Sequence, residues 1–155
     1  MVATSHLIFT DPVPSACQRD SWQRLFEVWS ARDEAPQGDI VVSFVSRLQM
    51  EELYFEYFGE RKATDVLSIP YVASPEDSLQ VMPAGEILIC LPVARQQAKQ
   101  VQASLEVELA TLFVHGLLHV TGRDHDTAAR KAAFHQDTHD IMETEKLTPV
   151  DLWSV

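Results

Sequence analysis

Three histidines in the second half of the chain have the spacing of a metal site. His115 and His119 are four residues apart, so on a helix their imidazoles lie one turn apart on the same face. Gly122 can end that helix in a left-handed conformation, which lets the chain turn and bring His125 toward the other two. Three neutral imidazoles with a fourth position open to water are typical of a catalytic zinc site. The sequence therefore predicts one zinc ion per chain, held by His115, His119 and His125.

The residue after the first histidine changes the chemistry that such an ion can support. The spacing H-x3-H-x5-H, with glycine three residues after the second histidine, is that of the metzincin peptidases, which carry a glutamate where this chain has Gly116. Glycine cannot take a proton, so the base is Asp124, an oxygen of a substrate phosphate, or hydroxide supplied by the metal site. Asp124 directly precedes the third histidine and is predicted as catalytic. Alternatively, it orients a ring N–H of a ligand or is an ordinary loop carboxylate.

Composition and charge limit the kind of partner that the chain can bind. With 155 residues, 46% hydrophobic and 23% charged, residues 1–155 are expected to form a single metal-dependent hydrolase domain. The net charge of −11 argues against binding nucleic acid by bulk electrostatics, but it permits a small cationic cleft with a metal ion at its base. Arg123, inside the metal motif, and Arg61 are predicted to face phosphate there, with Arg95 or Lys99 at the rim.

Localisation is predicted from three further features of the sequence. The first twenty residues lack a basic start followed by an apolar run, and no apolar stretch reaches about 18 residues, so neither a signal peptide nor a membrane span is expected. The two cysteines, Cys17 on the first expected helix and Cys90 in an apolar strand, read as buried thiols. A cytoplasmic protein is expected.

Hydrophobic periodicity and turn residues predict an α+β domain with a small mixed sheet of about four strands, packed with about five helices. The expected strands cover residues 2–10, 39–46, 64–71 and 85–91. The expected helices run from a cap at Ser15 to Ala31, over 47–58, over 92–102, from a cap at Ser104 to the turn at Gly122, and over 127–146. Residues 73–83 read as a long polar loop. The fourth helix, like the metal helix of metzincins, should direct its histidines into a cleft while an apolar stripe anchors it to the core.

Two side-chain patterns on the other helices are less specific. On the helix over 47–58, Met50, Leu53, Tyr54 and Tyr57 are expected to face inward. On the last helix, His135 and His139 form a second pair four residues apart. Because no turn and third ligand follow that pair, it is interpreted as a solvated helix face, with adventitious metal binding as the alternative.

Three motifs together resemble the YbeY family of bacterial endoribonucleases. They are T-D-V-L-S-I-P at 64–70, G-E-I-L-I-C at 85–90 and H-G-L-L-H-V-T-G-R-D-H at 115–125, in the family's order and spacing. The resemblance covers residues 40 to 145. It implies a small α+β domain, zinc on the three histidines, and metal-dependent cleavage of single-stranded RNA. It also implies a role in maturing and checking small-subunit ribosomal RNA, with ribosomal proteins or assembly factors as partners, and places Thr64 and Asp65 beside the cleft.

The chain departs from the family pattern shortly before T-D-V-L-S. The family usually has an asparagine followed by a tyrosine–arginine pair, and the arginine is thought to act on RNA. Here the corresponding residues are Tyr54, Tyr57 and Phe58, and Arg61 is expected to replace the arginine from a shifted position. Two alternative functions follow. One is a metal-binding ribosome-assembly factor without catalysis, and the other is a metallopeptidase-like hydrolase. Neither DNA nor a membrane is an expected partner.

Overall fold

The computed structural model describes residues 5–71 and 83–152, and within them the chain forms one four-stranded sheet and five helices. In chain order the elements are β1 (Leu7–Phe9), α1 (Arg19–Ser30), β2 (Ile40–Val45), α2 (Arg47–Phe58), β3 (Val66–Pro70), β4 (Gly85–Cys90), α3 (Leu91–Gln100), α4 (Leu105–Val120) and α5 (Ala128–Glu143). The strand order is β1-β2-β4-β3. The first three of these strands are parallel, and β3 runs antiparallel to β4 at the edge.

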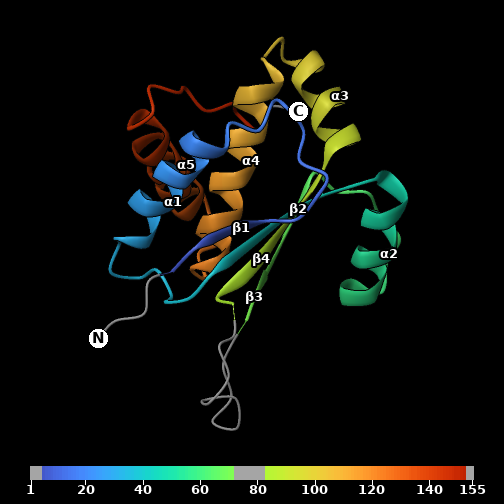
Figure 1. The fold of residues 1–155 in the computed structure, drawn as a ribbon, viewed down its shortest axis with the longest axis horizontal. Helices are drawn as coiled ribbons and strands as arrows, with labels where there is room; N and C mark the ends of the chain where they lie inside the picture. The colour runs from blue at the N-terminus through green and yellow to red at the C-terminus, as the bar shows by residue number, and fades with distance from the viewer. Residues whose placement is uncertain (1–4, 72–82, 153–155) are drawn as a thin grey trace, which may run out of the picture.

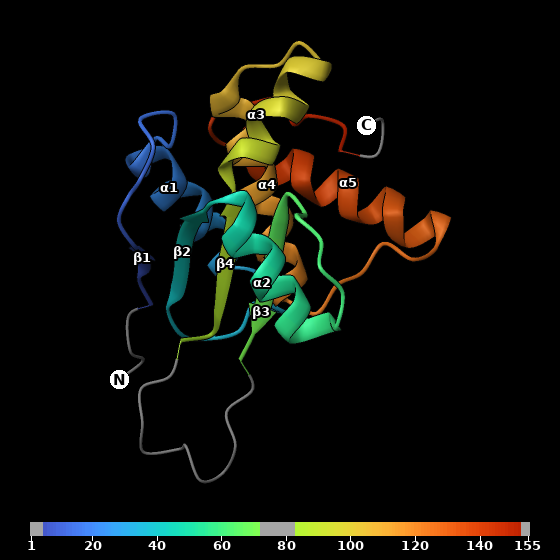
Figure 2. The ribbon, with the colours of Figure 1, turned by 90° about the vertical axis from the view of Figure 1, so that its right-hand side faces the viewer.

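The helices cover the two faces of the sheet unequally. Seen along the sheet, α1, α4 and α5 lie together on one face, and α2 lies alone on the other (Figure 1). The view turned by 90° places α2 in front of β3 and β4, with α5 projecting to the side (Figure 2). Helix α3 follows β4 directly, at the end of the sheet. The edge strand β3 therefore has α4 behind it and α2 in front of it.

The predicted α+β class, with its mixed sheet of four strands and its five helices, is confirmed. Several boundaries were wrong. The first helix begins at Arg19 after Gln18, because the N–H of Cys17 bonds to the carbonyl of Pro14 and turns the chain there. Neither the cap expected at Ser15 nor Cys17 is part of that helix. The third helix ends at Gln100, and Gln102 has a positive φ of 56°. Most of the loop expected over 73–83 lies outside the described residues.

Helix α4 is the central element of the main core. It is buried on almost every side. The apolar stripe predicted for it is buried throughout and consists of Leu109, Leu112, Phe113, Gly116, Leu117 and Val120. Trp22 of α1 stacks on Phe113 of α4 with ring centroids 4.4 Å apart. Ser104 caps the helix as predicted, since its side chain accepts a hydrogen bond from the N–H of Val107.

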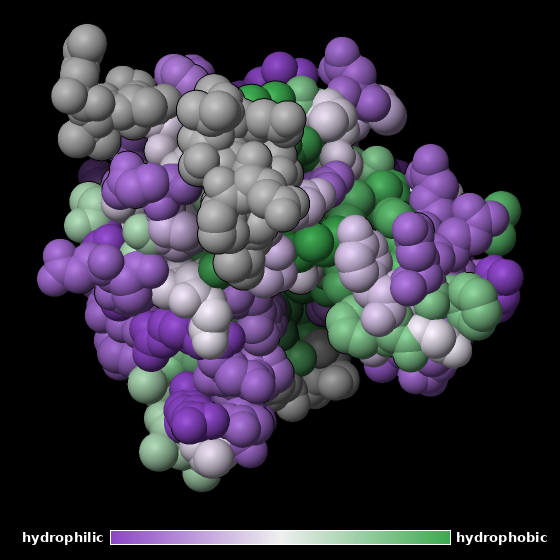
Figure 3. Space-filling view, turned by 90° about the horizontal axis from the view of Figure 1, so that it is seen from below, coloured by the Kyte–Doolittle hydropathy of each residue, from purple (hydrophilic) through white to green (hydrophobic). Residues whose placement is uncertain are grey.

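Helix α2 packs differently, on a smaller hydrophobic cluster formed by Met50, Leu67, Leu88 and Cys90. Met50 is its one buried residue, and Tyr57, which was expected to face inward, is 50% exposed. Viewed from below, the α2 lobe stands apart from the body of the molecule, and hydrophobic side chains gather in the hollow between them (Figure 3). Both ends of α2 are nevertheless well capped. A capping box joins Ser46 and Gln49, and Gly59 takes the left-handed conformation at φ 73°.

Among the described residues, no single helix is long and apolar enough to cross a membrane. Helices α3 and α4 reach the length and apolar composition of a membrane span only when taken together, and the pair is bent by 117° at the break between them.

Candidate functional site

The three histidines of the motif converge at the C-terminal end of α4. His115 and His119 lie on its last turns, and the turn at Gly122, where φ is 93°, returns the chain so that His125 faces them. One nitrogen of each ring lies within 4.8 Å of the others, and the Nε2 atoms of His115 and His119 are 3.0 Å apart. In the part of the chain that the structure describes, this is the one group of three or more ligand-type side chains close enough to hold a metal ion.

The surroundings of His115 and His119 favour neutral imidazoles, which are the form that binds a metal. Burial, followed by the neighbouring histidines, lowers the pKa of His115 to about 3. Burial also lowers the pKa of His119. The Nδ1 of His119 lies 3.1 Å from the backbone carbonyl oxygen of Arg123, which can only accept a hydrogen bond. The proton therefore sits on Nδ1, and the lone pair of Nε2 faces the cluster. This donor set fits zinc, for which three imidazoles are a common set of ligands.

A buried phenylalanine supports all three imidazoles. The ring centroid of Phe134, on α5, lies 4.7 Å from that of His115, 5.0 Å from that of His119 and 5.4 Å from that of His125. Phe134 is fully inaccessible to solvent. It therefore keeps water from one side of the cluster and limits the rotation of the rings.

Gly116, between the first two histidines, faces the sheet. A Cβ atom there would lie 2.9 Å from Cγ2 of Ile87 and 3.0 Å from Oγ of Ser68, both closer than normal contact. The hydroxyl of Ser68, on β3, donates to the carbonyl oxygen of Gly116 at 3.0 Å. Glycine thus lets α4 approach the edge strand, which holds the histidines beside β3. A glutamate does not fit at this position, so the peptidase base cannot be placed here.

The histidines open into a cleft of about 460 Å³ that runs along β3. The segment Thr64 to Ser68 forms one part of its lining, as the T-D-V-L-S motif suggested. The rest consists of aromatic or apolar side chains from other parts of the chain, namely Tyr54 and Phe58 of α2 and Leu152 near the C-terminus. Among the described lining residues there is no lysine or arginine.

Behind the cleft, Asp65 is linked to a buried carboxyl group. The surrounding hydrogen bonds orient the side-chain amide of Gln97 so that its NH2 group donates to Oε1 of Glu108 at 3.0 Å and to Oδ2 of Asp65 at 3.2 Å. Glu108 is fully inaccessible, and within the described ranges its Oε2 has no hydrogen-bond partner. Burial, assisted by the charge of Asp65, raises the pKa of Glu108 to about 7. The sequence placed Glu108 at a helix N-terminus but did not reveal that it is buried.

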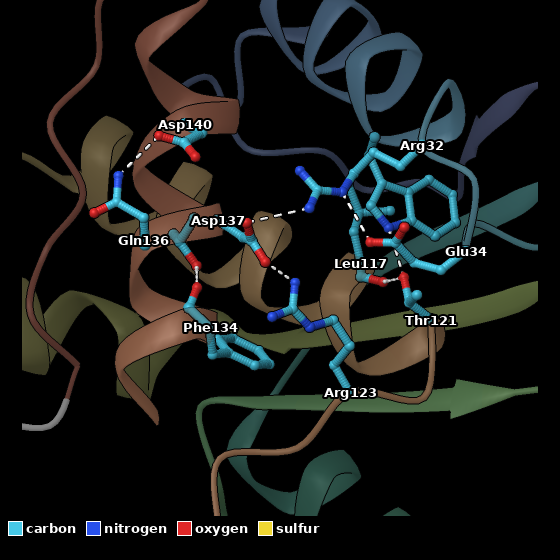
Figure 4. Close-up of polar contacts among 11 residues, drawn as sticks. Arg32, Glu34, Leu117, Thr121, Arg123, Phe134, Gln136, Asp137 and Asp140 are labelled. Carbon is cyan, nitrogen blue, oxygen red and sulfur yellow. Dashed lines mark hydrogen bonds and ion pairs between the residues drawn. The ribbon is translucent and has the colours of Figure 1, made fainter. Parts of the chain in front are cut away.

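Arg123 is held by an acidic partner on α5. Its guanidinium forms an ion pair with Asp137, which also pairs with Arg32 at 3.1 Å. Figure 4 shows Arg32 and Arg123 reaching the carboxylate of Asp137 from two sides. The backbone carbonyl of Arg123 accepts the hydrogen bond from His119. Through this arrangement α5 fixes the segment that orients a histidine of the cluster.

The other predicted polar residues lie outside the lining of the cleft. Oδ1 of Asp124 accepts a hydrogen bond from the backbone N–H of His125 at 2.7 Å, and the residue is exposed. Arg61 lies over the ring of Phe55, 4.8 Å from its centroid. Arg95 lines a different cavity, at the ends of the parallel strands. Lys99 is exposed in the last turn of α3. The structure thus brings the three histidines together but does not bring these four side chains into the cleft beside them.

The second histidine pair has a simpler setting. The rings of His135 and His139 lie 5.7 Å apart on α5, and both residues are partly exposed. Neither belongs to the three-histidine group. Phe134, Gln97 and Asp137 were not predicted from the sequence. They reach the site from other helices, α3 and α5, and no local motif marks them.

Comparison with known proteins relates most of the chain to one family. The family model described as Endoribonuclease YbeY matches residues 12–146. A relative named Endoribonuclease YbeY from Geobacillus kaustophilus is 30% identical over 154 residues, which cover 94% of this chain and 99% of the relative. Another of the same name, from Renibacterium salmoninarum, is 41% identical over 101 residues, covering 63% of this chain and 64% of the relative.

A solved structure is similar in fold. The solution structure of a Thermotoga maritima protein matches with a TM-score of 0.58 and 20% identity, over 92% of each chain. At that identity the match supports the arrangement of the helices and strands.

Proposed function

The chain belongs to the YbeY family of endoribonucleases, and from this premise we propose that it cleaves single-stranded RNA with one zinc ion held by His115, His119 and His125. The observation that carries the proposal is the convergence of these three imidazoles in a cleft beside the edge strand. Residues 1–155 are proposed to act as a single metal-dependent hydrolase domain.

When bound, a zinc ion supplies a Lewis acid for a phosphoryl oxygen and lowers the pKa of a coordinated water to about 7. The protein's own contribution is to hold the site in place. Phe134 packs against all three imidazoles, and the carbonyl of Arg123 keeps the proton of His119 on Nδ1. Ser68 and Gly116 set the distance between α4 and β3.

Two carboxylates compete for the role of general base. Asp124 precedes His125 in sequence, whereas Asp65 lines the cleft itself. We propose Asp124 as the base, with Asp65 as its rival. Cleavage rates of Asp124→Asn and Asp65→Asn, at equal metal content, separate the two. Unchanged cleavage by Asp124→Asn would exclude Asp124.

The arginines are proposed to act at different distances from the substrate. Arg61, which is exposed in the segment that follows α2, is proposed to contact an RNA phosphate. Arg123 is proposed to assist catalysis through the position of His119, because its guanidinium is already paired with Asp137.

Ribosomal RNA, in its maturation and quality control, is the proposed substrate. The small ribosomal subunit or its assembly factors are the proposed partners, and the cytoplasm, which suits two buried free thiols, is the proposed location.

One alternative is favoured by a specific observation. Phe58 occupies the position where the family usually carries its arginine, which favours a metal-binding assembly factor without catalysis. Removing the metal distinguishes the two, because loss of a structural metal should unfold the domain and loss of a catalytic metal should not. The peptidase alternative is disfavoured by the space around Gly116.

The decisive test is an RNA cleavage assay with purified protein on single-stranded and duplex RNA, with and without a chelator. The His119→Ala variant, purified in the same way, controls for contaminating nuclease. We expect chelator-sensitive cleavage of the single strand by the wild type alone. Equal cleavage by the His119→Ala variant would overturn the proposal.

A further inference from the structure

The part of the cleft that α2 contributes is aromatic. Tyr54 and Phe58 lie one turn apart on the same face of α2, and their ring centroids are 4.6 Å apart with planes tilted by 36°. Phe58 is the last residue of the helix and is 61% exposed. Its ring is thus available to a ligand in the cleft.

The side chains of the protein provide little electrostatic attraction for RNA in this cleft. The chain has a net charge of −11, and Asp65 is the charged side chain that lines the cleft among the described residues. Lys62 lies beside the aromatic pair, with its Nζ 5.8 Å from the ring centroid of Tyr54. The side chains that line the cleft therefore have to hold RNA mainly through contacts other than phosphate charge.

Aromatic rings supply such contacts, since every nucleobase has a π face that stacks on them whatever its sequence. We propose that Tyr54 and Phe58 form a stacking site for one unpaired nucleobase beside the histidine cluster, with Lys62 facing the adjoining phosphate. This inference rests on the proposed function and names how the substrate is held. It gives a physical reason for a preference for single strands, because bases within a duplex are already stacked on one another.

The position of the two rings relative to the metal site follows from the fold. β3 separates α2 from α4 and lines the same cleft, so a base on Phe58 and a phosphate near the histidines belong to one short stretch of RNA. Gly59, in the left-handed conformation, ends the helix directly after Phe58 and holds the ring at that end. At position 58, where the family usually carries an arginine, the phenylalanine of this chain thus offers stacking in place of a charged contact.

The test measures binding of a fluorescent single-stranded oligouridine by anisotropy, beside the same oligomer with abasic nucleotides. Stacking predicts that Phe58→Ala weakens oligouridine binding about 5- to 150-fold. Phe58→Leu should behave like Phe58→Ala, whereas Phe58→Trp should bind as the wild type does. The abasic oligomer should bind the wild type and Phe58→Ala equally. The slope of log affinity against log salt should be the same for both, because no phosphate contact is lost.

The matched control is Tyr57→Ala, which removes another aromatic ring from α2. Tyr57 is 50% exposed and is not among the residues that line the cleft in the described chain, so its loss should leave RNA binding unchanged. If Phe58→Ala binds oligouridine as the wild type does, or if it weakens binding of the abasic oligomer equally, the stacking site is refuted while the RNA-cleaving function stands. If the wild type neither binds nor cleaves single-stranded RNA, the proposed function fails and the stacking site fails with it.

Discussion

The two helices that contribute to the cleft are held in opposite ways. α4, which carries His115 and His119, is buried on nearly all sides by the sheet and by α1, α3 and α5. α2, which carries the aromatic pair, buries Met50 alone and leaves several large apolar side chains in solvent, among them Leu48, Phe55 and Phe58. Burial in the core holds α4 in place, whereas α2 is defined mainly by the caps at its two ends.

This difference matches the tasks that we assign to the two sides. A metal site needs imidazoles held to within a fraction of an ångström, and a packed core supplies that rigidity. A site that stacks unpaired bases of any sequence needs accessible rings, and an exposed helix supplies them. Substitutions on α4 should therefore affect metal binding and stability, whereas those at Tyr54 and Phe58 on α2 should affect RNA binding.

The largest contrast is expected in metal content and turnover. His119→Ala removes a ligand, so it should lower metal per chain and reduce RNA cleavage by more than about 100-fold, the upper range for losing only a supporting partner. Phe58→Ala should keep the metal content of the wild type. Metal analysis of both proteins, purified without added metal, checks the pair. Full metal occupancy in His119→Ala would remove that histidine from the ligand set.

A Leu→Ala substitution should lower the free energy of unfolding by several kcal/mol more on α4 than on α2. Leu117→Ala on α4 leaves a cavity in the core and should lower the free energy of unfolding by about 2–5 kcal/mol. Leu48→Ala on α2, where the side chain is 62% exposed, should change it by no more than about 0.5 kcal/mol. Denaturant unfolding of both variants measures the difference. Equal losses would mean that α2 is held as firmly as α4.

The sequence predicted one side of this comparison better than the other. The histidine cluster was predictable because its ligands lie within eleven residues, and helix spacing with one glycine determines where they point. The stripe of α4 was equally clear. On α2, apolar residues occur on all sides, so periodicity could not tell that Tyr57 is exposed. The family membership was also predictable, because three motifs stand in the right order.

Residues that act across long sequence separations could not be predicted. Arg123 was expected to face phosphate because it stands inside the metal motif. Asp137, its partner, lies fourteen positions away on another helix, and only the packing of α5 on α4 joins them. Phe134 reaches the histidines in the same way. Glu108 resembled a favourable first-turn residue, and its burial depends on α3 and β3.

Stability should also depend on pH through Glu108, on the α4 side. Its pKa is raised to about 7 in the folded protein, so the folded state binds the proton more tightly than the unfolded chain does. The contribution of Glu108 to stability should therefore be fully present below the ordinary glutamate pKa of about 4.3 and should be lost as the pH rises through about 7. Between pH 5 and 8, metal-free wild type should lose up to about 3 kcal/mol more than Glu108→Gln, which cannot ionise. Parallel pH profiles of the two proteins would show that Glu108 is not the group responsible.

The smallest expected effect is a loss of metal affinity after substitution of Asp137. It tests how precisely the segment that follows α4 is positioned. Asp137→Asn weakens the ion pairs with Arg32 and Arg123, so the carbonyl that orients His119 becomes less firmly placed. Removing a supporting partner of this kind typically costs about 10-fold in metal affinity. Competition with a chromogenic chelator measures that loss directly, without any turnover.

Asp140→Asn is the matched control for this last prediction. Asp140 lies one turn further along α5, is exposed and bonds to Gln136, so the variant removes the same charge without touching the Arg123 segment. It should bind zinc as tightly as the wild type does. Equal losses in both variants would mean that the negative charge of α5, acting through solvent, matters more than the position of Arg123. A loss confined to Asp137→Asn would show that the precision of the site extends from α4 into the contacts of α5.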